Sequence, residues 1–555
     1  MDRRDFLTAK RRKKPVASSQ ASRIITSGIN PYSGPWTENE IVHLLKRTMF
    51  GAKKADVDYF KTKTVSQTVN ELLNPTAPQP SPPLKEYVTT TTVGAIPDTN
   101  ILQGTTWVND INNDGTVQSQ RIASYKKWWT GVLINQDRSI REKLQMFWVN
   151  HFGNEAGDVG NGNWTYKQHD LIRQNGLGNF KQMVDAITKD ISMLRYLNGY
   201  LNVASAPDEN YGRELMELLT LGKGSGSQYT ENDVKEAAKV LTGWQINGTT
   251  YTSVFTSGRH STVNKTFSSF FNNTVIVGRT GATAGQLELT DLLNMIFATQ
   301  EVAKFIVRKF YRFFVYYTID ATTETNVIGP LADIFRTNNY DIRSVLSAMF
   351  KSEHFFDVLN QNCYIKNPAD HIIGSLREMN AVFPAQTDWD TNYGMWNFFY
   401  AYMVNTGQNL NDPPNVSGMP AYYQEPLFHE IWINSDSLPK RNQFTDLMVN
   451  TGYTRNNQKV QFNLVAYVQQ FSNPGNPNDL IDDALKFIFR NQLSYESKKT
   501  IKTQILLSNQ QWDYYWTNAW MAYLSSPTTA NFNIINNRLK SLFQYFFNLA
   551  EYQLS

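Results

Sequence analysis

The chain has few of the residues that build disulfides and metal clusters. Its 555 residues include one cysteine, Cys363, and seven histidines, none of which forms an HxH or HxxxH pair. A disulfide within the chain and a cysteine-based zinc cluster are therefore excluded. We expect Cys363 to be a small buried apolar residue, and we expect no bound metal and no cofactor.

Charge and long apolar runs are also scarce. Asp, Glu, Lys and Arg make up 18% of the residues, and no apolar run reaches the ~18 residues of a membrane-spanning helix. The net charge of +4 comes from the first fourteen residues, which carry seven basic and two acidic side chains. The remainder is close to neutral, so we expect no nucleic-acid partner and no transmembrane helix.

The N-terminus is similar to a twin-arginine export signal without its apolar segment. Arg3 and Arg4 are followed by Asp5-Phe6-Leu7, as in such signals, but the basic run 10–14 takes the place of the apolar region. We expect residues 1–35 to form a flexible basic tail. The motif favours a periplasmic or cell-surface location over a cytoplasmic one.

Two capping boxes predict where helices begin. Thr37 and Glu40 have the spacing at which a hydroxyl and a carboxylate each accept a hydrogen bond from a free backbone N–H of the first turn. Ser139 and Glu142 have the same spacing and predict a helix that continues to about Phe152.

Further helices follow from apolar residues at helical spacing. Asn367 and Pro368 suit the N-cap and first position of one of them. The predicted ranges are 208–221, 231–242, 286–318, 327–337, 341–357, 368–381 and much of 446–555.

Three segments do not show the helical pattern. Residues 74–120 hold five closely spaced prolines, which preclude a helix there, and 89–93 is typical of a strand or extended loop. Residues 245–280 are rich in Thr, Ser, Asn, Val and Phe, which indicates a β-rich insertion. Residues 405–435 contain four prolines and two glycines, which indicates a long irregular loop.

These patterns predict a mainly α protein, a large multi-helix body with a small β-rich insertion and long Pro-rich loops. We divide the chain into the tail 1–35, a helical domain 36–445 and a C-terminal helical region 446–555 packed on it. The domain 36–445 includes the Pro-rich segment 74–120 and the β-rich insertion 245–280.

Six ordered motifs resemble the bacterial domain of unknown function 1800 family. They are 43–52 (HLLKRTMFGA), 141–152 (REKLQMFWVNHF), 209–222 (ENYGRELMELLTLG), 229–244 (YTENDV to LTGW), 366–368 (KNP) and 413–418 (PPNVSG). The resemblance implies a bacterial protein that is often exported. It also implies a partner, since such genes frequently lie beside those of a sulfatase-like protein. No activity comes with it.

The chain resembles a divergent member of this family, because it departs from the family pattern at several positions. Positions where the family often has histidine, or a characteristic Asp or Trp, hold Val149, Leu219, Ser261 and Met419 here. If those histidines bound a metal, this chain has lost ligands.

The helix predicted at 208–221 carries the candidate catalytic residues. Glu209, Arg213, Glu214 and Glu217 share one face, with i,i+4 spacing between acids and arginine. In one interpretation Glu214 acts as a general acid or base with His151 nearby. A solvated salt-bridged face and a buried ion network that joins helices explain the same pattern.

Four further residues are candidates for binding because they lie in or next to the same motifs: Asn210, Tyr211, Trp148 and Trp244. No P-loop, GxGxxG, GxSxG or HExxH motif is present. We therefore expect an extracytoplasmic structural or interaction protein that acts with a partner protein. The alternative is a hydrolase-like enzyme that uses the Glu/Arg cluster with the nearby histidine.

Overall fold

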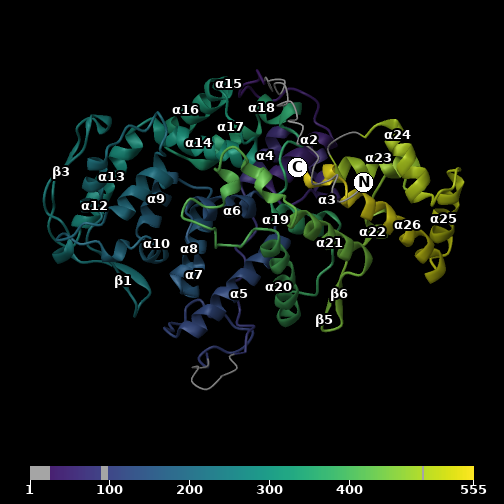
Figure 1. The fold of residues 1–555 in the computed structure, drawn as a ribbon, viewed down its shortest axis with the longest axis horizontal. Coiled ribbons are helices and arrows are strands. Elements are labelled where there is room, and N and C mark those ends of the chain that lie inside the picture. The colour runs from purple at the N-terminus through teal and green to yellow at the C-terminus, as the bar shows by residue number, and fades with distance from the viewer. Residues whose placement is uncertain (1–24, 89–97, 490–492) are drawn as a thin grey trace, which may run out of the picture.

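The computed structural model describes residues 25–88, 98–489 and 493–555 (Figure 1). Helices make up most of these residues and the strands are short, so the predicted mainly α class is confirmed. The predicted extended segment 89–93 and most of the basic tail lie outside the described residues.

The first half of the chain builds the body from short helices. They are α2 (Glu38–Thr48), α3 (Lys54–Lys61), α4 (Val65–Leu73), α5 (Gly115–Ile134), α6 (Arg141–His151), α7 (Ala156–Val159), α8 (Gly162–Asn175), α9 (Phe180–Thr188), α10 (Ile191–Tyr196), α11 (Glu209–Glu214) and α12 (Glu231–Val240). The described part of the Pro-rich segment forms no helix as far as Asp114, as its prolines predict. Helix α5 begins at Gly115, so the last residues of the range 74–120 are helical, contrary to expectation.

The second half continues in the same way. Its helices are α13 (Ala284–Ala298), α14 (Glu301–Phe314), α15 (Ala321–Thr323), α16 (Gly329–Thr337), α17 (Ile342–Phe350), α18 (Glu353–Phe356), α19 (Pro368–Glu378), α20 (Trp389–Asn405), α21 (Ser437–Asn450), α22 (Leu464–Val468), α23 (Pro477–Ile488), α24 (Tyr495–Thr500), α25 (Tyr514–Ser525) and α26 (Thr529–Phe547). Wider π-helical turns occur at η2 (Leu215–Thr220), η5 (Glu324–Ile328) and η9 (Ile501–Leu506).

Helix starts agree with the sequence in one capping box and differ in the other. The Thr37–Glu40 box is confirmed at the start of α2. The box at Ser139 and Glu142 is wrong, because Ile140 is the N-cap and the Ser139 hydroxyl accepts instead from the Arg141 amide at 3.3 Å. Both carboxylate oxygens of Glu142 instead accept hydrogen bonds from the buried Arg173 of α8. The tertiary ion pair with Arg173 therefore engages the Glu142 side chain, which a capping box would need for the backbone.

Two predicted helices are each divided into two. The range 286–318 is α13 and α14, and the chain turns where Thr299 adopts an extended conformation. The range 341–357 is α17 and α18, because the extended Ser352 interrupts it and its hydroxyl caps the second helix at the Phe355 amide. Neither break contains Gly or Pro, so periodicity alone could not show it.

The start of α19 is as predicted, with Asn367 as N-cap and Pro368 as first residue. Just before it, Cys363 is half-buried rather than buried, and its Sγ lies 3.2 Å from the Asn360 carbonyl oxygen. The thiol was expected in the apolar core, but its polar contacts keep it at the edge of the core.

The insertion contains the strands that its composition predicts. β1 (Trp244–Asn247) pairs antiparallel with β2 (Thr252–Phe255), and β3 (Lys265–Thr266) pairs with β4 (Val275–Ile276). A third pair, β5 (Tyr453–Arg455) and β6 (Gln458–Val460), follows α21. The remaining short elements are the 3₁₀ turns η1 (Gly199–Leu201), η3 (Ser257–Arg259), η4 (Ser269–Phe271), η6 (Val358–Asn360), η7 (Pro420–Tyr422), η8 (Phe428–Trp432) and η10 (Ala550–Gln553).

Residues 25–35, which the sequence analysis assigns to the tail, are attached to the body. The Tyr32 amide donates to the Lys351 carbonyl oxygen at 2.7 Å, and the Glu353 amide donates to Asn30 at 2.8 Å. Ile25 is buried. The ordered body, which we expected to begin at Trp36, therefore also includes residues 25–35.

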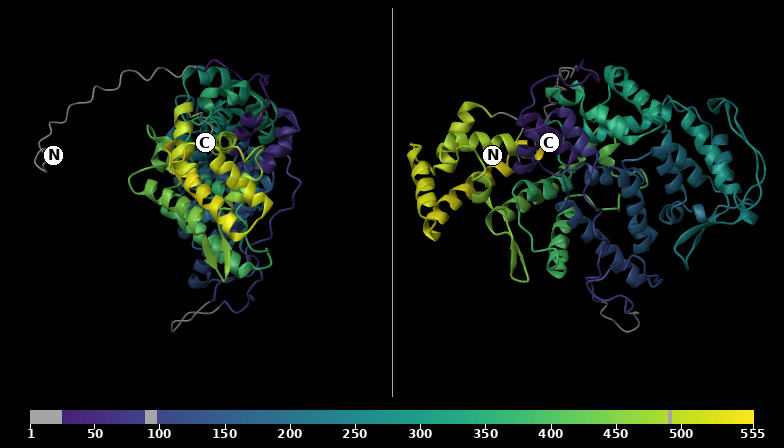
Figure 2. Two further views of the ribbon diagram at one scale, coloured as in Figure 1. Left: turned by 90° about the vertical axis from the view of Figure 1, so that its right-hand side faces the viewer. Right: turned by 180° about the vertical axis from the view of Figure 1, so that it is seen from behind.

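One continuous apolar core joins the two ends of the chain. It extends from Ile41 in α2 to Tyr552 near the C-terminus. The backbone amide of Ser555 donates to the Tyr364 carbonyl oxygen at 2.8 Å, which anchors the C-terminus in the middle of the molecule. Helices α24 to α26 form the opposite end of the elongated body from β1 and β3 (Figures 1 and 2).

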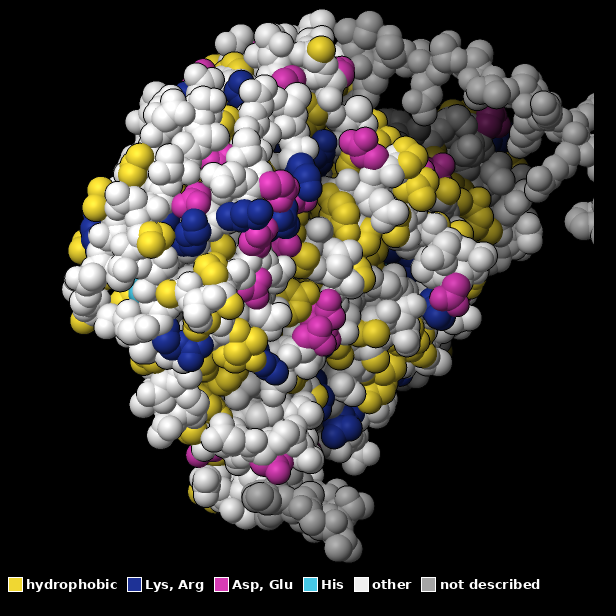
Figure 3. Space-filling model, turned by 60° about the vertical axis from the view of Figure 1, so that its left-hand side comes forward, with side chains coloured by type: hydrophobic (Ala, Val, Ile, Leu, Met, Phe, Trp, Pro, Cys, Tyr) yellow, Lys and Arg dark blue, Asp and Glu magenta, His cyan; other side chains and the backbone are white. Residues whose placement is uncertain are grey.

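The surface carries mixed charge. On the face in Figure 3, acidic and basic side chains lie beside one another in the middle of the face and do not form an area of one sign. Within the described ranges, no helix is both long and apolar enough to span a bilayer.

Candidate functional site

The candidate catalytic helix changes geometry halfway along. Asp208 caps α11 by accepting a hydrogen bond from the Asn210 amide at 2.9 Å. After Glu214 the helix widens into η2, and the Thr220 hydroxyl donates to the Leu215 carbonyl oxygen at 2.6 Å. Thr220, which straight-helix spacing places on the polar face, is fully buried because the extra residue of the π turn rotates the end of the helix. Single π turns are frequent at functional sites.

Arg213 is the centre of a solvated ion-pair network. It bonds Glu209 within α11 at 3.2 Å and Glu231 of α12 at 2.6 Å. Glu217 pairs instead with the exposed Lys223 at 3.1 Å. The Arg213 guanidinium lowers the pKa of the Glu231 carboxyl. Pairs of this exposure contribute little to stability, and this network ties α11 to α12.

Glu214 differs from the other acids of the cluster. Its side chain is half-buried, and burial together with the nearby Glu217 carboxylate raises its pKa. Burial raises the pKa of the neighbouring Tyr229 to about 12. Within this cluster, Glu214 is the carboxyl whose pKa the surroundings raise.

His151 contacts the backbone of η2 rather than the carboxylates. It ends α6, is 2% exposed, and its Nε2 lies 3.2 Å from the Leu219 carbonyl oxygen. Its Nδ1 lies 3.1 Å from Nζ of Lys309 in α14, which also donates to Leu218 O at 3.1 Å. The imidazole therefore donates from Nε2 and accepts at Nδ1, and both side chains bind the carbonyl end of the π turn.

Burial sets the charge of this pair. The pKa of His151 is well below its ordinary range because of burial and the nearby Lys309. Burial, with a contribution from the Arg312 guanidinium, lowers the pKa of Lys309 to about 7. Sequence reasoning missed Lys309, because it lies 158 residues after His151 and in no motif.

The four candidate binding residues lie in different surroundings. Trp148 is fully buried and its Nε1 donates to Gly176 O at 2.9 Å. Tyr211 is buried and donates to Ile187 O at 3.3 Å, whereas Asn210 is exposed and donates to Leu197 O at 3.0 Å. Trp244, at the start of β1, packs on Phe255. Trp148 and Tyr211 are thus part of the core.

Two motifs far apart in sequence meet at the end of α6. The Met419 amide donates to Oδ1 of Asn150 at 2.6 Å. Gly418 has φ +88°, and a Cβ there would lie 2.5 Å from the Asn150 carbonyl oxygen, so only glycine fits. The motifs at 141–152, 209–222 and 413–418 therefore converge around Asn150 and His151.

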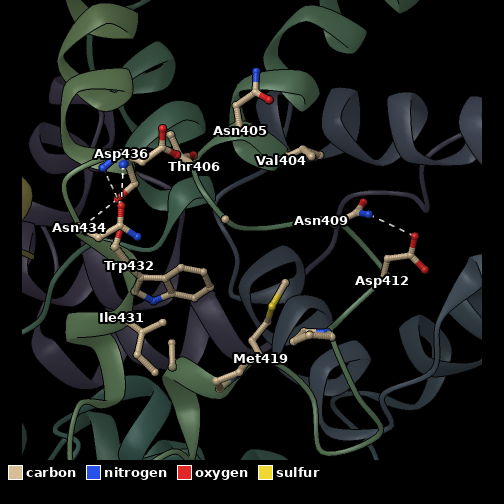
Figure 4. Close-up of a pocket in the computed structure, with 15 residues that line it drawn as sticks. Val404, Asn405, Thr406, Asn409, Asp412, Met419, Ile431, Trp432, Asn434 and Asp436 are labelled. Atoms are coloured by element: carbon tan, nitrogen blue, oxygen red, sulfur yellow. Dashed lines mark hydrogen bonds between the residues drawn. The ribbon is translucent and has the colours of Figure 1, made fainter.

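The loop that carries the 413–418 motif also lines a cavity of about 550 Å³ (Figure 4). Trp432, Ile431 and Met419 lie along one side, with Asn409 and Asp412 at one end (Figure 4). Asp412 bonds Lys126 of α5 at 2.6 Å and Asn409 at 3.2 Å. The Asp412 carboxylate is therefore engaged, whereas the buried Trp432 indole N–H has no hydrogen-bond partner among the described residues.

A second buried cluster lies in the insertion. Glu288 of α13 is fully buried, lies 3.2 Å from Nε2 of His260 and pairs with the buried Lys265. Sequence reasoning singled out the adjacent Ser261 but none of these three residues. Among the residues that the structure describes, no group of three His, Cys, Asp or Glu side chains is placed to hold a metal.

The convergence of motifs agrees with the family comparison. Comparison with curated proteins and with solved structures gives no match. The family model described as "Protein of unknown function (DUF1800)" matches residues 43–554, so it includes the C-terminal helices beyond the last sequence motif. The chain therefore belongs to the DUF1800 family.

Proposed function

We propose that the protein is an extracytoplasmic interaction protein that binds a partner protein through the outer face of α25. The observation that carries the proposal is the composition of this face, which consists of Tyr514, Met521 and Leu524 together with Trp512, which lies two residues before the helix begins. These side chains are 51–65% exposed. We call them the α25 face.

The α25 face has the composition of an interface core. Helix α25 contains no charged residue, and interface cores are depleted of charge and enriched in Trp, Tyr and Met. Its other side is anchored, because Trp516 and Trp520 are buried and Trp516 Nε1 donates to Pro474 O at 2.8 Å. The exposed side chains are therefore presented on a rigid helix at one end of the molecule (Figure 1).

The motif residues support a role in building the fold. His151 bonds to the backbone of η2, together with the non-motif Lys309, and Asn150 accepts a hydrogen bond from the Met419 amide next to the 413–418 motif. Such contacts hold segments together without requiring a substrate. The family resemblance suggests a sulfatase-like protein as the first partner to test.

The test measures binding of purified full-length protein to the purified sulfatase-like neighbour by biolayer interferometry. Met521→Glu with Leu524→Glu places two charges on the α25 face and should weaken binding by about tenfold or more. Val263→Glu changes an apolar side chain of the insertion that is 55% exposed, and serves as the matched control. Unchanged binding by the double variant, or no binding by wild type, would refute the proposal.

A hydrolase is the second candidate, and Glu214 is the observation that favours it. Its raised pKa and its place at the start of a π turn suit a general acid. Hydrolysis of chromogenic ester, phosphate and glycoside substrates should then be lost in Glu214→Gln. It should persist in Glu231→Gln, which alters only the exposed end of the network.

A further inference from the structure

A cleft lies between α5, α20 and the Pro-rich segment that precedes α5. Its volume is about 610 Å³, which falls among small-molecule sites. Helices α5 and α20 lie side by side (Figure 1). The cleft is separate from the Glu/Arg cluster, the His151 pair and the cavity of Figure 4.

Aromatic rings form one wall of the cleft. Trp389 and Trp396, on α20, are half-buried, so part of each indole remains open. Trp128 of α5 and Tyr393 are buried behind them. We call these four residues and the cavity that they line the tryptophan cleft.

Two glycines allow the half-buried indoles to approach the backbone closely. A Cβ at Gly131 of α5 would lie 2.5 Å from the ring of Trp396, and a Cβ at Gly104 would lie 2.8 Å from the ring of Trp389. Each ring therefore lies against a backbone position at which any larger residue would clash with it. The rings are held in place before any ligand arrives, which lowers the entropy cost of binding.

The opposite wall is also fixed. Nε1 of Trp128 donates to the Ser81 carbonyl oxygen at 2.7 Å, and Arg141 donates to the Ala77 carbonyl oxygen at 2.9 Å. The Leu84 amide donates to the Tyr393 hydroxyl at 2.7 Å. These bonds hold the Pro-rich segment extended along the cleft.

The cleft also contains neutral polar groups that have no hydrogen-bond partner among the described residues. Gln136 is 8% exposed, and neither atom of its amide has a hydrogen-bond partner among the described residues. The Trp396 indole N–H is likewise unpartnered within the described part of the chain. A buried polar group without a partner costs about 1–3 kcal/mol, so a molecule that supplies the missing bonds is favoured.

The charged groups of the cleft are already engaged. Both oxygens of Glu142 accept from Arg173, at 2.7 and 2.6 Å. Asp137 accepts from the Ser139 hydroxyl at 2.6 Å, and the Arg141 guanidinium donates to backbone carbonyls. Asp137 and Arg141 have opposite charges and Glu142 is paired with Arg173, so the cleft presents no excess charge of one sign to an ionic ligand.

We propose that the tryptophan cleft binds a neutral carbohydrate, with a sugar ring stacked on Trp389 and Trp396 and its hydroxyls bonded to the Gln136 amide. A sugar ring has an apolar C–H face for the indoles, and each hydroxyl can both donate and accept. A wholly apolar ligand would leave Gln136 unsatisfied. This site goes beyond the proposed binding of a partner protein and does not depend on it.

The test titrates the full-length protein with cellohexaose and with chitohexaose by isothermal calorimetry, up to about 5 mM. Trp389→Ala and Gln136→Leu should each weaken binding by about tenfold or more, because one removes a stacking ring and the other the polar partner. Tyr495→Ala removes an exposed aromatic ring outside both proposed sites and should leave the affinity unchanged. Circular dichroism confirms that each variant is folded.

Gly131→Ala gives a second, independent variant. It removes none of the proposed ligand-binding side chains, but its Cβ displaces the Trp396 ring, so it should also weaken binding. The proposal would be overturned if neither sugar released heat, or if the cleft variants did not change the affinity. It would also be overturned if a proline-rich decapeptide, and neither sugar, changed the tryptophan fluorescence of the protein. The last result would assign the cleft to peptide binding.

Discussion

Lys309 of α14 donates a hydrogen bond to Nδ1 of His151 across 3.1 Å, and both side chains bind carbonyls at the end of the same π turn. Helix C-terminal carbonyls favour a positive charge, yet burial lowers the pKa of Lys309 to about 7. A lysine whose pKa lies near neutral pH therefore joins α6, η2 and α14, three segments that are remote in sequence.

Lys309→Met should change the pH dependence of stability. Above about pH 7 the folded lysine loses its proton, while the unfolded lysine keeps it up to its ordinary pKa of 10.5. Wild-type stability therefore gains from Lys309 as pH rises through this window. The stability of the variant relative to wild type should fall by ~1–3 kcal/mol between about pH 6 and pH 9 in urea unfolding. A constant difference would show that Lys309 stays charged.

Four buried histidines should make the fold sensitive to acid. Burial lowers the pKa of His151, His169 and His371 well below 6.5, and lowers that of His429 to about 4. Below pH 6.5 the unfolded chain binds protons that the folded chain does not, so stability falls as pH falls. His169→Phe should reduce this slope by about one proton, or ~1.4 kcal/mol per pH unit. The control is Asp333→Asn, which alters an exposed carboxylate. An unchanged slope in the histidine variant would contradict the assignment.

Gly418→Ala should disrupt the contact between two family motifs. Both Gly418 and Gly281 have φ +88°, but an added Cβ at Gly281 meets nothing within 4 Å. Gly281→Ala should cost ~1 kcal/mol for the backbone conformation alone. Gly418→Ala adds a clash with the Asn150 carbonyl oxygen, so we expect ~3 kcal/mol or more. Equal losses of melting temperature would show that the motif loop moves freely.

Glu288→Gln should separate the buried ion cluster from the exposed network. The substitution keeps the shape of the side chain but leaves Lys265 buried without its counter-charge, at a cost of ~3–5 kcal/mol. Glu231→Gln breaks the pair with Arg213, in which Glu231 is 67% exposed, and should leave the free energy of unfolding unchanged. Guanidinium unfolding of both variants checks the contrast, and comparable losses would refute it.

Local sequence signals predicted the elements whose causes are local. The Thr37 capping box, the Asn367–Pro368 start and the strands of the insertion were confirmed, because each depends on residues within a few positions. The box at Ser139 failed where a local motif competed with a distant partner, Arg173. The break at Thr299 was missed because no residue marks it in the sequence.

The sequence by itself determined the helical class, the Pro-rich and β-rich interruptions and the family motifs, since these depend on composition and on short-range spacing. Only the tertiary structure decided what surrounds the candidate residues. It placed His151 against Lys309 and the carbonyls of η2, left Arg213 in a solvated network, and brought Gln136 beside the indoles of α20. These relationships join residues up to hundreds of positions apart, and burial, which sets their pKa values and unsatisfied hydrogen bonds, exists only once the core has formed.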